Sequence, residues 1–378
     1  MLKQFFIATI SVLVLNSTTA QTTKTAVQYY DEGIKFQDSE KYTEALASFK
    51  KALGKNPNYK EALYSAGWVS NELKKYSDAI PYLQKAKGLW PNEAKVYLEL
   101  GYAYSKLGKK EDAIQNLTRC LTIKDDYALA YKYLAVLYYD DDDYERSLKN
   151  IKSYLEYAPD SKDDDIYYRK GVAENEQEQY DDALASLEKA DELNPNNVKF
   201  LNEIGYTYYS KKDADEALRY YRKSLNIDPK SVTALNGVAN VYRKLKKDMK
   251  EAIRLFAKTL EVDPKNISAN YWTAWSYNEQ GKYNDAIPYL KKVLEIDDKY
   301  VSAYTELGYC DYALKNYEDA LVNFKKAFAI EKTELNIYYT GLCYVGMKDK
   351  SSALKMLNDL KGMNSKYVSE LQESIDKL

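Results

Sequence analysis

The chain has 378 residues, 45% hydrophobic and 30% charged, which is the composition of a folded protein rather than of a disordered one. Its 55 Lys and Arg nearly balance 57 Asp and Glu, which argues against a nucleic-acid binder, because such proteins present a basic face to phosphates. The absence of histidine excludes Ser-His-Asp and Cys-His catalysis and removes the commonest metal ligand. Three cysteines are too few for a disulfide framework or a four-cysteine zinc site. We therefore expect no catalytic residue, no metal site and no cofactor.

Residues 1–20 have the pattern of a secretory signal peptide. Lys3 gives a positive start, the run from Phe5 to Leu15 is largely apolar, and small residues lead up to Ala20. The run is too short to span a bilayer, and no second apolar stretch follows it. A buried N-terminal helix is the alternative. The pattern predicts an exported protein, periplasmic or secreted, with no transmembrane segment in the mature chain and a short segment at 21–25.

A period of 34 residues governs the rest of the chain. A glycine of the first predicted helix recurs at this spacing, as Gly33, Gly67 and Gly101. An alanine of the second predicted helix recurs in the same way, as Ala45, Ala79 and Ala113. A proline follows the second helix in six places, where it prevents the helix from continuing: Pro57, Pro91, Pro159, Pro195, Pro229 and Pro264. Regular self-similarity of this length is typical of a helical repeat array.

These residues resemble the tetratricopeptide repeat, a helix–turn–helix unit. Ten repeats fit residues 26–363, and they start at Ala26, Lys60, Ala94, Ala128, Asp164, Val198, Val232, Ile267, Val301 and Glu334. The resemblance implies an all-α, right-handed superhelical solenoid in which stacking buries a core that one repeat cannot bury alone. Residues 364–378 are predicted to form a C-terminal capping helix, because their apolar residues fall at helical spacing. The small departures from the period, including one extra residue near Asp248, are expected in turns.

Nineteen of the 40 tyrosines fit the packing positions of the repeat, but a second set does not. The resemblance implies that positions 2, 5, 9, 12 and 13 of each first helix face a concave groove. Aromatic residues at these positions are Tyr30, Tyr64, Trp68, Tyr102, Tyr139, Tyr168, Tyr206, Tyr209, Tyr271, Trp275, Tyr309 and Tyr312, with Tyr338 in the last repeat. Tyrosine and tryptophan dominate interface hot spots, so these residues are candidates for partner binding. Packing between neighbouring repeats is the alternative.

Two repeats share a more specific pattern at these positions. It reads Tyr64, Trp68, Asn71, Glu72 in one repeat and Tyr271, Trp275, Asn278, Glu279 in the other. The spacing places the tyrosine, tryptophan and asparagine on one stripe of a helix. Such a stripe suits a peptide backbone, or a sugar ring held by stacking and amide hydrogen bonds.

A polar sector lies further along the chain. Lys199 and Asn202 precede Asn236, Asn240 and Arg243, and the last two share a helical face. These residues loosely resemble the clamp by which some tetratricopeptide-repeat proteins grip a terminal carboxylate, but the next repeat has Trp272 where asparagine is usual. We interpret the sector as a basic-amide patch for an acidic peptide segment, with a solvated helix face as the alternative.

Two functional hypotheses follow. The first is an exported, non-enzymatic scaffold that binds a protein or peptide partner in an aromatic-lined groove, for envelope assembly, secretion or complex organisation. The second is an accessory protein that binds carbohydrate or cell-wall polymer through the Tyr/Trp stripe. Homo-oligomerisation is not indicated by the sequence.

Overall fold

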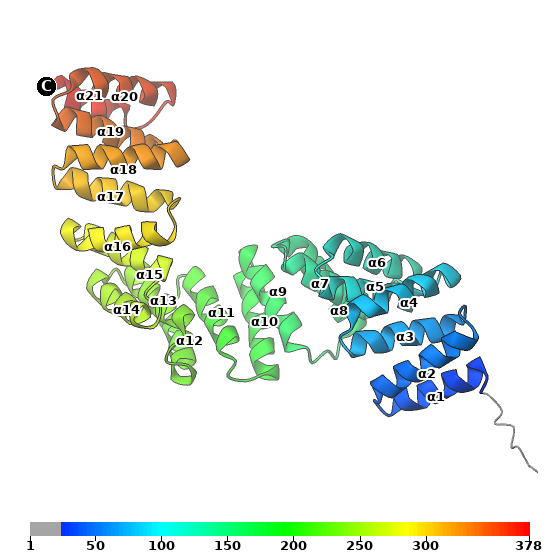
Figure 1. The fold of residues 1–378 in the computed structure, drawn as a ribbon. Coiled ribbons are helices and arrows are strands. Elements are labelled where there is room, and N and C mark those ends of the chain that lie inside the picture. Colours follow the sequence, from blue (N-terminus) through cyan, green and yellow to red (C-terminus); the bar gives the residue numbers. More distant parts are fainter. Residues whose placement is uncertain (1–23) are drawn as a thin grey trace, which may run out of the picture. The chain divides into compact units, whose positions relative to one another are not determined.

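The computed structural model describes residues 24–378, so the predicted signal peptide lies outside the described residues. Within them the fold is all-α, with 21 α-helices and one π-helical turn (Figure 1). Twenty of the α-helices form ten antiparallel pairs, as the 34-residue period predicted, and the last stands alone at the C-terminus.

The first helix of each pair begins at the residue where the sequence analysis starts a repeat. The first helices are α1 Ala26–Asp38, α3 Lys60–Glu72, α5 Ala94–Lys106, α7 Ala128–Tyr139, α9 Asp164–Glu176, α11 Val198–Ser210, α13 Val232–Asn240, α15 Ile267–Asn278, α17 Val301–Ala313 and α19 Glu334–Gly346. The second helices are α2 Tyr42–Lys55, α4 Tyr76–Leu89, α6 Lys110–Ile123, α8 Tyr144–Tyr157, α10 Tyr180–Leu193, α12 Ala214–Ile227, α14 Met249–Val262, α16 Tyr283–Ile296, α18 Tyr317–Ile330 and α20 Lys350–Gly362.

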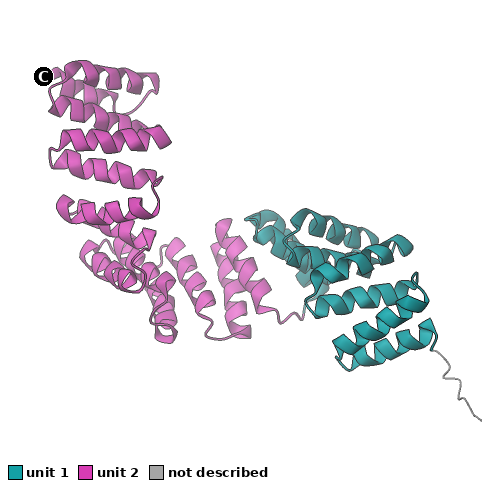
Figure 2. Cartoon of the chain, in the orientation of Figure 1, with its two compact units in different colours: residues 1–159 teal, residues 160–378 magenta. Residues whose placement is uncertain are grey.

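The chain divides into two compact units at Pro159 (Figure 2). Unit 1 contains the helix pairs from α1 to α8, and unit 2 contains those from α9 onwards. The division falls at residues 158–163, where the sequence has two more residues than its period requires and the structure has a turn.

Close contact between the two helices of a pair depends on the recurrent glycine. A Cβ atom on Gly67 of α3 would lie 2.4 Å from Leu83 Cγ of α4, a distance that real Cβ contacts do not reach. Ala79 of α4, four residues before Leu83, is fully buried. Glycine in a helix costs about 1 kcal/mol relative to alanine, so its retention here reflects the need for two backbones to approach each other.

The extra residue of the seventh repeat was predicted to lie in a turn, and this prediction is wrong. Helix α13 continues into a π-helical turn, η1 Val241–Leu245, in which the Lys246 N–H donates to the Val241 carbonyl at 3.0 Å. A π-turn absorbs one inserted residue without ending the helix. The insertion is accommodated there because Val238 and Val241, on either side of the junction, both stay buried in the core of unit 2.

The C-terminal helix α21, Val368–Asp376, caps the last pair. Leu371 and Ile375 are fully buried against α19 and α20, as their helical spacing predicted, whereas Leu378 is exposed. The three cysteines are buried and form no disulfide.

The glycine contact gives a stability prediction. Gly67→Ala should destabilise the fold by about 1–3 kcal/mol, because the added methyl group overpacks the contact with Leu83. Gly88→Ala is the matched control, since a Cβ on Gly88 of α4 would meet nothing within 4 Å. It should be neutral or stabilising by up to about 1 kcal/mol. Urea unfolding followed by circular dichroism measures both, and equal stabilities of the two variants would contradict the account.

Candidate functional site

All the predicted partner-binding residues lie on first helices or on the π-turn that continues one. Successive first helices contact each other within each unit, for example α3 with α5 and α11 with α13. In the described part of the chain, no two successive second helices contact each other to a similar extent. The first helices therefore line the inner face of each stack. We call this surface the inner face.

The predicted residues differ widely in exposure. Glu72 and Tyr206 are exposed. Those that are half-buried are Tyr30, Tyr64, Trp68, Tyr102, Tyr139, Tyr209, Asn236, Asn240, Trp275, Tyr309 and Tyr312. Those that are buried are Asn71, Tyr168, Arg243, Tyr271 and Asn278. The half-buried rings therefore keep more accessible surface than the buried side chains of the predicted set.

The half-buried rings pack against neighbouring repeats as well as facing outward. Trp68 meets the ring of Tyr42 from the preceding repeat edge-on, with centroids 5.8 Å apart. Tyr102 packs on Tyr133 of the following repeat at 5.1 Å. The packing alternative is therefore confirmed for these two rings, and partner binding through the part of each ring that stays accessible remains a prediction.

The two predicted asparagines are engaged between repeats. The Asn71 Nδ2 group donates to the carboxylate of Glu99 at 2.8 Å and to its carbonyl at 3.1 Å. In the same way, the Asn278 Nδ2 group donates to the carboxylate of Glu306 at 2.7 Å. These amides join one first helix to the next, so they are not free to hold a peptide backbone or a sugar hydroxyl.

A third copy of this bond was missed by the sequence analysis. Asn175 donates to the Glu203 carboxylate at 2.8 Å, again across 28 residues, although Val172 replaces the tryptophan of the other copies. The signal that could have revealed it is a tetrapeptide, Glu-(Leu/Ile)-Gly-Tyr, which occurs at 99–102, 203–206 and 306–309.

Burial disfavours ionisation of these three glutamates. It raises the pKa of Glu99 to about 7, against an opposing effect of the Asn71 hydrogen bond and with a further contribution from nearby Glu72. Burial likewise raises the pKa of Glu203 and Glu306, opposed by their own asparagines. Lys199 favours ionisation of Glu203, whereas no nearby cation of the described residues does so for Glu99 or Glu306.

Arg243 is the other unusual charge of the inner face. It lies in η1, only 9% of it is exposed, and its guanidinium carbon is 3.6 Å from the ring centroid of Trp272 and 5.4 Å from that of Trp275. Its Nε and Nη2 atoms both donate to Asn240 Oδ1, at 3.2 and 3.1 Å. No carboxylate in the described residues pairs with it, and burial lowers its pKa. The sequence pattern linked Arg243 with Asn240 but did not show that the cation is buried.

The remaining members of the polar sector make internal contacts. Asn236 donates to Asn266, the N-cap residue of α15, at 3.1 Å. Asn202 donates to Ser231 at 3.2 Å, and the Lys199 ammonium stacks on the Tyr168 ring at 3.9 Å. Arg243 is therefore the member of this sector whose charge is left without a counter-charge.

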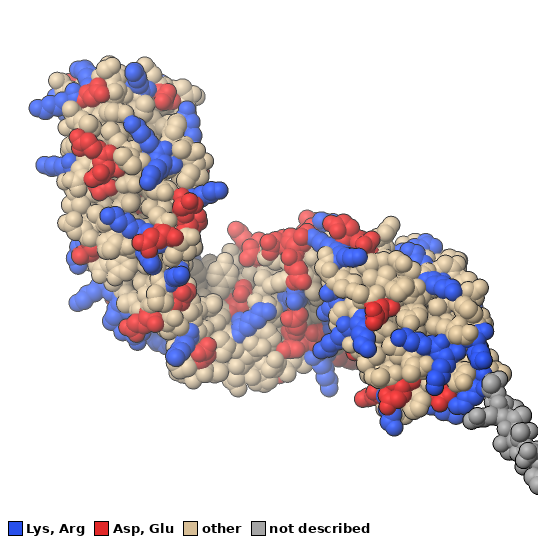
Figure 3. Space-filling view, in the orientation of Figure 1, with Lys and Arg blue, Asp and Glu red and all other residues tan. Residues whose placement is uncertain are grey.

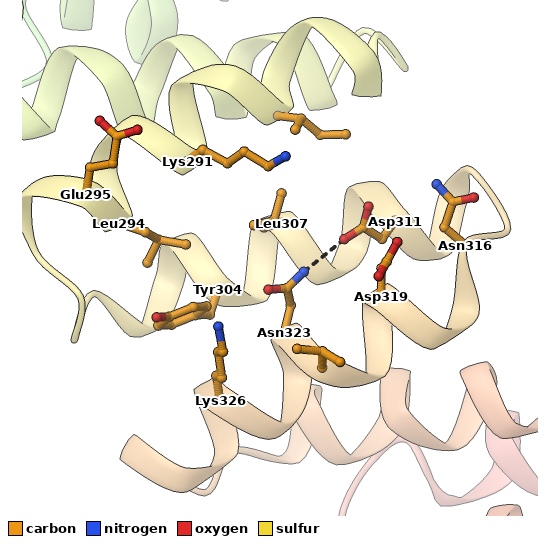
Figure 4. Close-up of a pocket in the computed structure, with 12 residues that line it drawn as sticks. Lys291, Leu294, Glu295, Tyr304, Leu307, Asp311, Asn316, Asp319, Asn323 and Lys326 are labelled. Atoms are coloured by element: carbon orange, nitrogen blue, oxygen red, sulfur yellow. Dashed lines mark hydrogen bonds between the residues drawn. The ribbon is translucent and has the colours of Figure 1, made fainter.

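A hollow of about 730 Å³ lies between α16, α17 and α18, away from the predicted residues (Figure 4). The buried Asp311 carboxylate forms part of its lining and accepts a hydrogen bond from Asn323 at 2.9 Å. Asp311 stands at a position that holds tyrosine in six other repeats: Tyr104, Tyr138, Tyr208, Tyr242, Tyr277 and Tyr344. Lysines and carboxylates both line it, so its charge selects no class of ligand.

Known sequence families account for much of the chain. Tetratricopeptide-repeat families match residues 30–94, 94–127 and 168–232. The chain is a tetratricopeptide-repeat protein with ten helix pairs. The family of anaphase-promoting complex, cyclosome, subunit 3 also matches, at residues 246–327. Tetratricopeptide-repeat proteins are typically non-enzymatic scaffolds for protein interactions.

Curated relatives match only a short part of this tetratricopeptide-repeat chain. Photosystem I assembly protein Ycf3 of Rippkaea orientalis is 34% identical over 80 residues, which are 20% of this chain and 46% of that protein. The same protein of Prochlorococcus marinus strain NATL1A is 33% identical over 82 residues, 21% of this chain and 47% of that protein. The chain thus spans about half the length of the curated relatives it matches.

Solved structures share the fold at low sequence identity. A monomeric IFIT1 mutant with Gppp-AAAA superposes with a TM-score of 0.52 and 17% identity, covering 93% of this chain and 90% of that one. Pseudomonas aeruginosa pilF superposes with a TM-score of 0.50 and 18% identity, covering 56% of this chain and 96% of that one. These similarities show the fold alone.

Charges of both signs are interspersed on the face drawn in Figure 3, and neither sign covers a whole unit there. Among residues 24–378, no group of three or more His, Cys, Asp or Glu side chains is arranged to hold a metal ion. No helix of this part of the chain is both long and apolar enough to cross a membrane.

The raised pKa of Glu99 makes the stability of the repeat stack depend on pH. Its folded pKa of about 7 exceeds the usual 4.5, so its contribution to stability is full below about pH 4.5 and is lost as the pH rises through about 7. Glu99→Gln cannot ionise and keeps an oxygen for Asn71. Relative to wild type, the variant should therefore be about 2 kcal/mol more stable at about pH 8 than at about pH 5, which means a larger free energy of unfolding.

Urea unfolding at the two pH values measures this difference. The exposed Glu44→Gln variant on α2 is the control, and its difference from wild type should not change with pH. A Glu99→Gln difference that is equally independent of pH would show that Glu99 ionises normally in the folded chain.

Proposed function

We propose that this chain is an exported, non-enzymatic scaffold that holds a protein or peptide partner on its inner face. The observation that carries the proposal is the buried guanidinium of Arg243. Removing a charge from water is costly unless a counter-charge compensates it, and no carboxylate of the described residues does so here. A carboxylate supplied by the partner would complete the site.

The surroundings of Arg243 suit such a contact. Trp272 and Trp275 fix the guanidinium plane, while Asn240 takes two of its N–H groups and leaves the Nη1 side for a ligand. A planar guanidinium binds a carboxylate with defined geometry, and such contacts are stronger when they are shielded from water. Arginine and tryptophan are also the residues most enriched at the energetic centres of protein interfaces.

Export rests on the pattern of residues 1–20, and a role in assembly rests on analogy. Among the relatives, Ycf3 is named as a photosystem I assembly protein, and this chain matches about half of it. We propose a comparable role in complex assembly or secretion at the cell envelope. Carbohydrate binding is the weaker alternative, because Asn71 and Asn278, the amides that would grip a sugar, are used between repeats.

Partner capture tests the proposal. The tagged full-length chain is expressed in the organism that encodes it and crosslinked in the exported fraction, and captured proteins are identified by mass spectrometry. Arg243→Met keeps the stem that stacks on Trp272 and removes the charge. It should lower capture of the partner at least about tenfold, because a buried charged contact is lost. The mass of the recovered chain shows whether residues 1–20 have been removed.

Arg254→Met is the matched control in the same repeat. Arg254 lies on α14, is exposed, and pairs with Glu251 of its own helix, so its loss should leave capture unchanged. Equal capture by the two variants would refute the role of Arg243. Capture of no protein by wild type, with retention on cell-wall polymer instead, would favour the carbohydrate hypothesis.

A further inference from the structure

The Asn–Glu bonds described above belong to a larger pattern that recurs every third repeat. Each copy has a tyrosine at position 5 and Asn-Glu at positions 12 and 13 of one first helix, followed by Glu-(Leu/Ile)-Gly-Tyr at positions 6 to 9 of the next. Glu99, Glu203 and Glu306 are separated by 104 and 103 residues, about three periods. One copy lies in unit 1 and two lie in unit 2.

Each copy brings two carboxylates to the inner face. One is the buried or half-buried glutamate that accepts the asparagine N–H, and the other is an exposed glutamate beside that asparagine. The pairs are Glu72 with Glu99, Glu176 with Glu203, and Glu279 with Glu306. We call each pair, with its asparagine, an acidic joint.

The acidic joints have no basic partner within the described chain. None of their six glutamates forms an ion pair with a lysine or arginine there. Lys199, one turn before Glu203, is the near exception, but its ammonium stacks on Tyr168. In two of the joints the side-chain oxygen of the asparagine is also buried and accepts no hydrogen bond; these atoms are Oδ1 of Asn71 and Oδ1 of Asn175. Each joint thus offers one exposed carboxylate without an ion pair, beside a second carboxylate whose ionisation burial disfavours and a bound cation would favour.

A purely structural role does not explain the carboxylate. Glutamine at the same position would accept the asparagine N–H equally well and would avoid the cost of a buried charge. The protein nevertheless has glutamate in all three copies, each next to a second glutamate. A negative charge is therefore the property that distinguishes these positions.

Aromatic faces adjoin each acidic joint. Tyr102, Tyr206 and Tyr309 lie three residues after the accepting glutamates, on the same face of their helices. Tyr206 is 42% exposed, because the following repeat has glycine, Gly237, where the other copies have Tyr133 and Tyr339. Carboxylates beside electron-rich rings form a receptor for an organic cation. At the first joint the chain's own Lys106 already lies 5.4 Å from the centre of the Tyr102 ring, so a partner cation would take its place there.

We propose that each acidic joint receives one lysine or arginine side chain of a protein partner, so that the partner is basic wherever it meets a joint. This proposal rests on the proposed function, because it assumes that the inner face holds a protein. It names the chemistry of the partner: cationic side chains at the three joints, in addition to the carboxylate taken by Arg243. The two joints of unit 2 would reinforce each other through effective concentration if one partner reaches both.

A binding assay with a simple cationic polymer tests the proposal. The probe is fluorescein-labelled poly-L-lysine, and the same polymer with acetylated side chains is the uncharged probe. Fluorescence anisotropy compares the wild-type full chain with the triple variant Glu99→Gln, Glu203→Gln, Glu306→Gln, which keeps an acceptor for each asparagine. We expect the triple variant to bind poly-L-lysine at least about tenfold more weakly than wild type. The acetylated polymer should bind neither protein.

Two further variants keep the test decisive. The surface variant changes the net charge by the same amount as the joint variant, but on exposed faces of second helices; it carries Glu44→Gln, Glu188→Gln and Glu318→Gln. It should bind poly-L-lysine within about twofold of wild type. If circular dichroism shows that the joint variant does not fold, a second triple variant replaces it, with Glu72→Gln, Glu176→Gln and Glu279→Gln. These glutamates are exposed, so their replacement should not disturb the fold.

Equal weakening in the joint variant and the surface variant would overturn the proposal, since long-range charge would then explain binding. Failure of wild type to bind poly-L-lysine would overturn it as well. Neither result bears on the capture of a partner through Arg243, so the proposed function is judged separately.

Discussion

The close approach of two helices at a glycine is the contact on which the whole structure depends. At Gly67 the space of a Cβ atom is taken by Leu83, so the pair packs more closely than two ordinary helices could. Repeating this contact every 34 residues makes each pair alike, and a pair buries its apolar faces only by stacking on its neighbours. An inner face made of first helices follows from the stacking, and with it the placement of every candidate binding residue.

The inner face combines packing with exposure. Trp68 and Tyr102 support the contact between repeats with part of each ring and leave the rest open. The same surface holds charges of both signs that are not paired internally, namely Arg243 and the acidic joints. A stack that needed only stability would neutralise such groups or replace them, because buried unpaired charge is costly. Their retention is the physical reason to assign binding to this face.

The sequence predicted the fold in detail because the period is a local signal. The starts of α3 and α15, for example, follow directly from residue spacing. Contacts between repeats were harder to predict, since Asn71 and Glu99 lie 28 residues apart and only the structure shows that they meet. The π-turn at Val241–Leu245 was also missed, because an insertion in a turn and one inside a helix leave the same trace in the sequence. The burial of Arg243 depends on that turn and was unpredictable for the same reason.

Side-chain footprinting of the captured complex tests the central claim most directly. Hydroxyl radicals oxidise exposed tyrosine and tryptophan, and mass spectrometry reports the rate at each residue with and without the partner. Tyr206 on the inner face and Tyr157 on α8 are almost equally exposed, at 42% and 43%. We expect the partner to protect Tyr206, Trp68 and Trp275 and to leave Tyr157 unchanged. Protection of Tyr157 with unchanged oxidation of Tyr206 would contradict binding on the inner face.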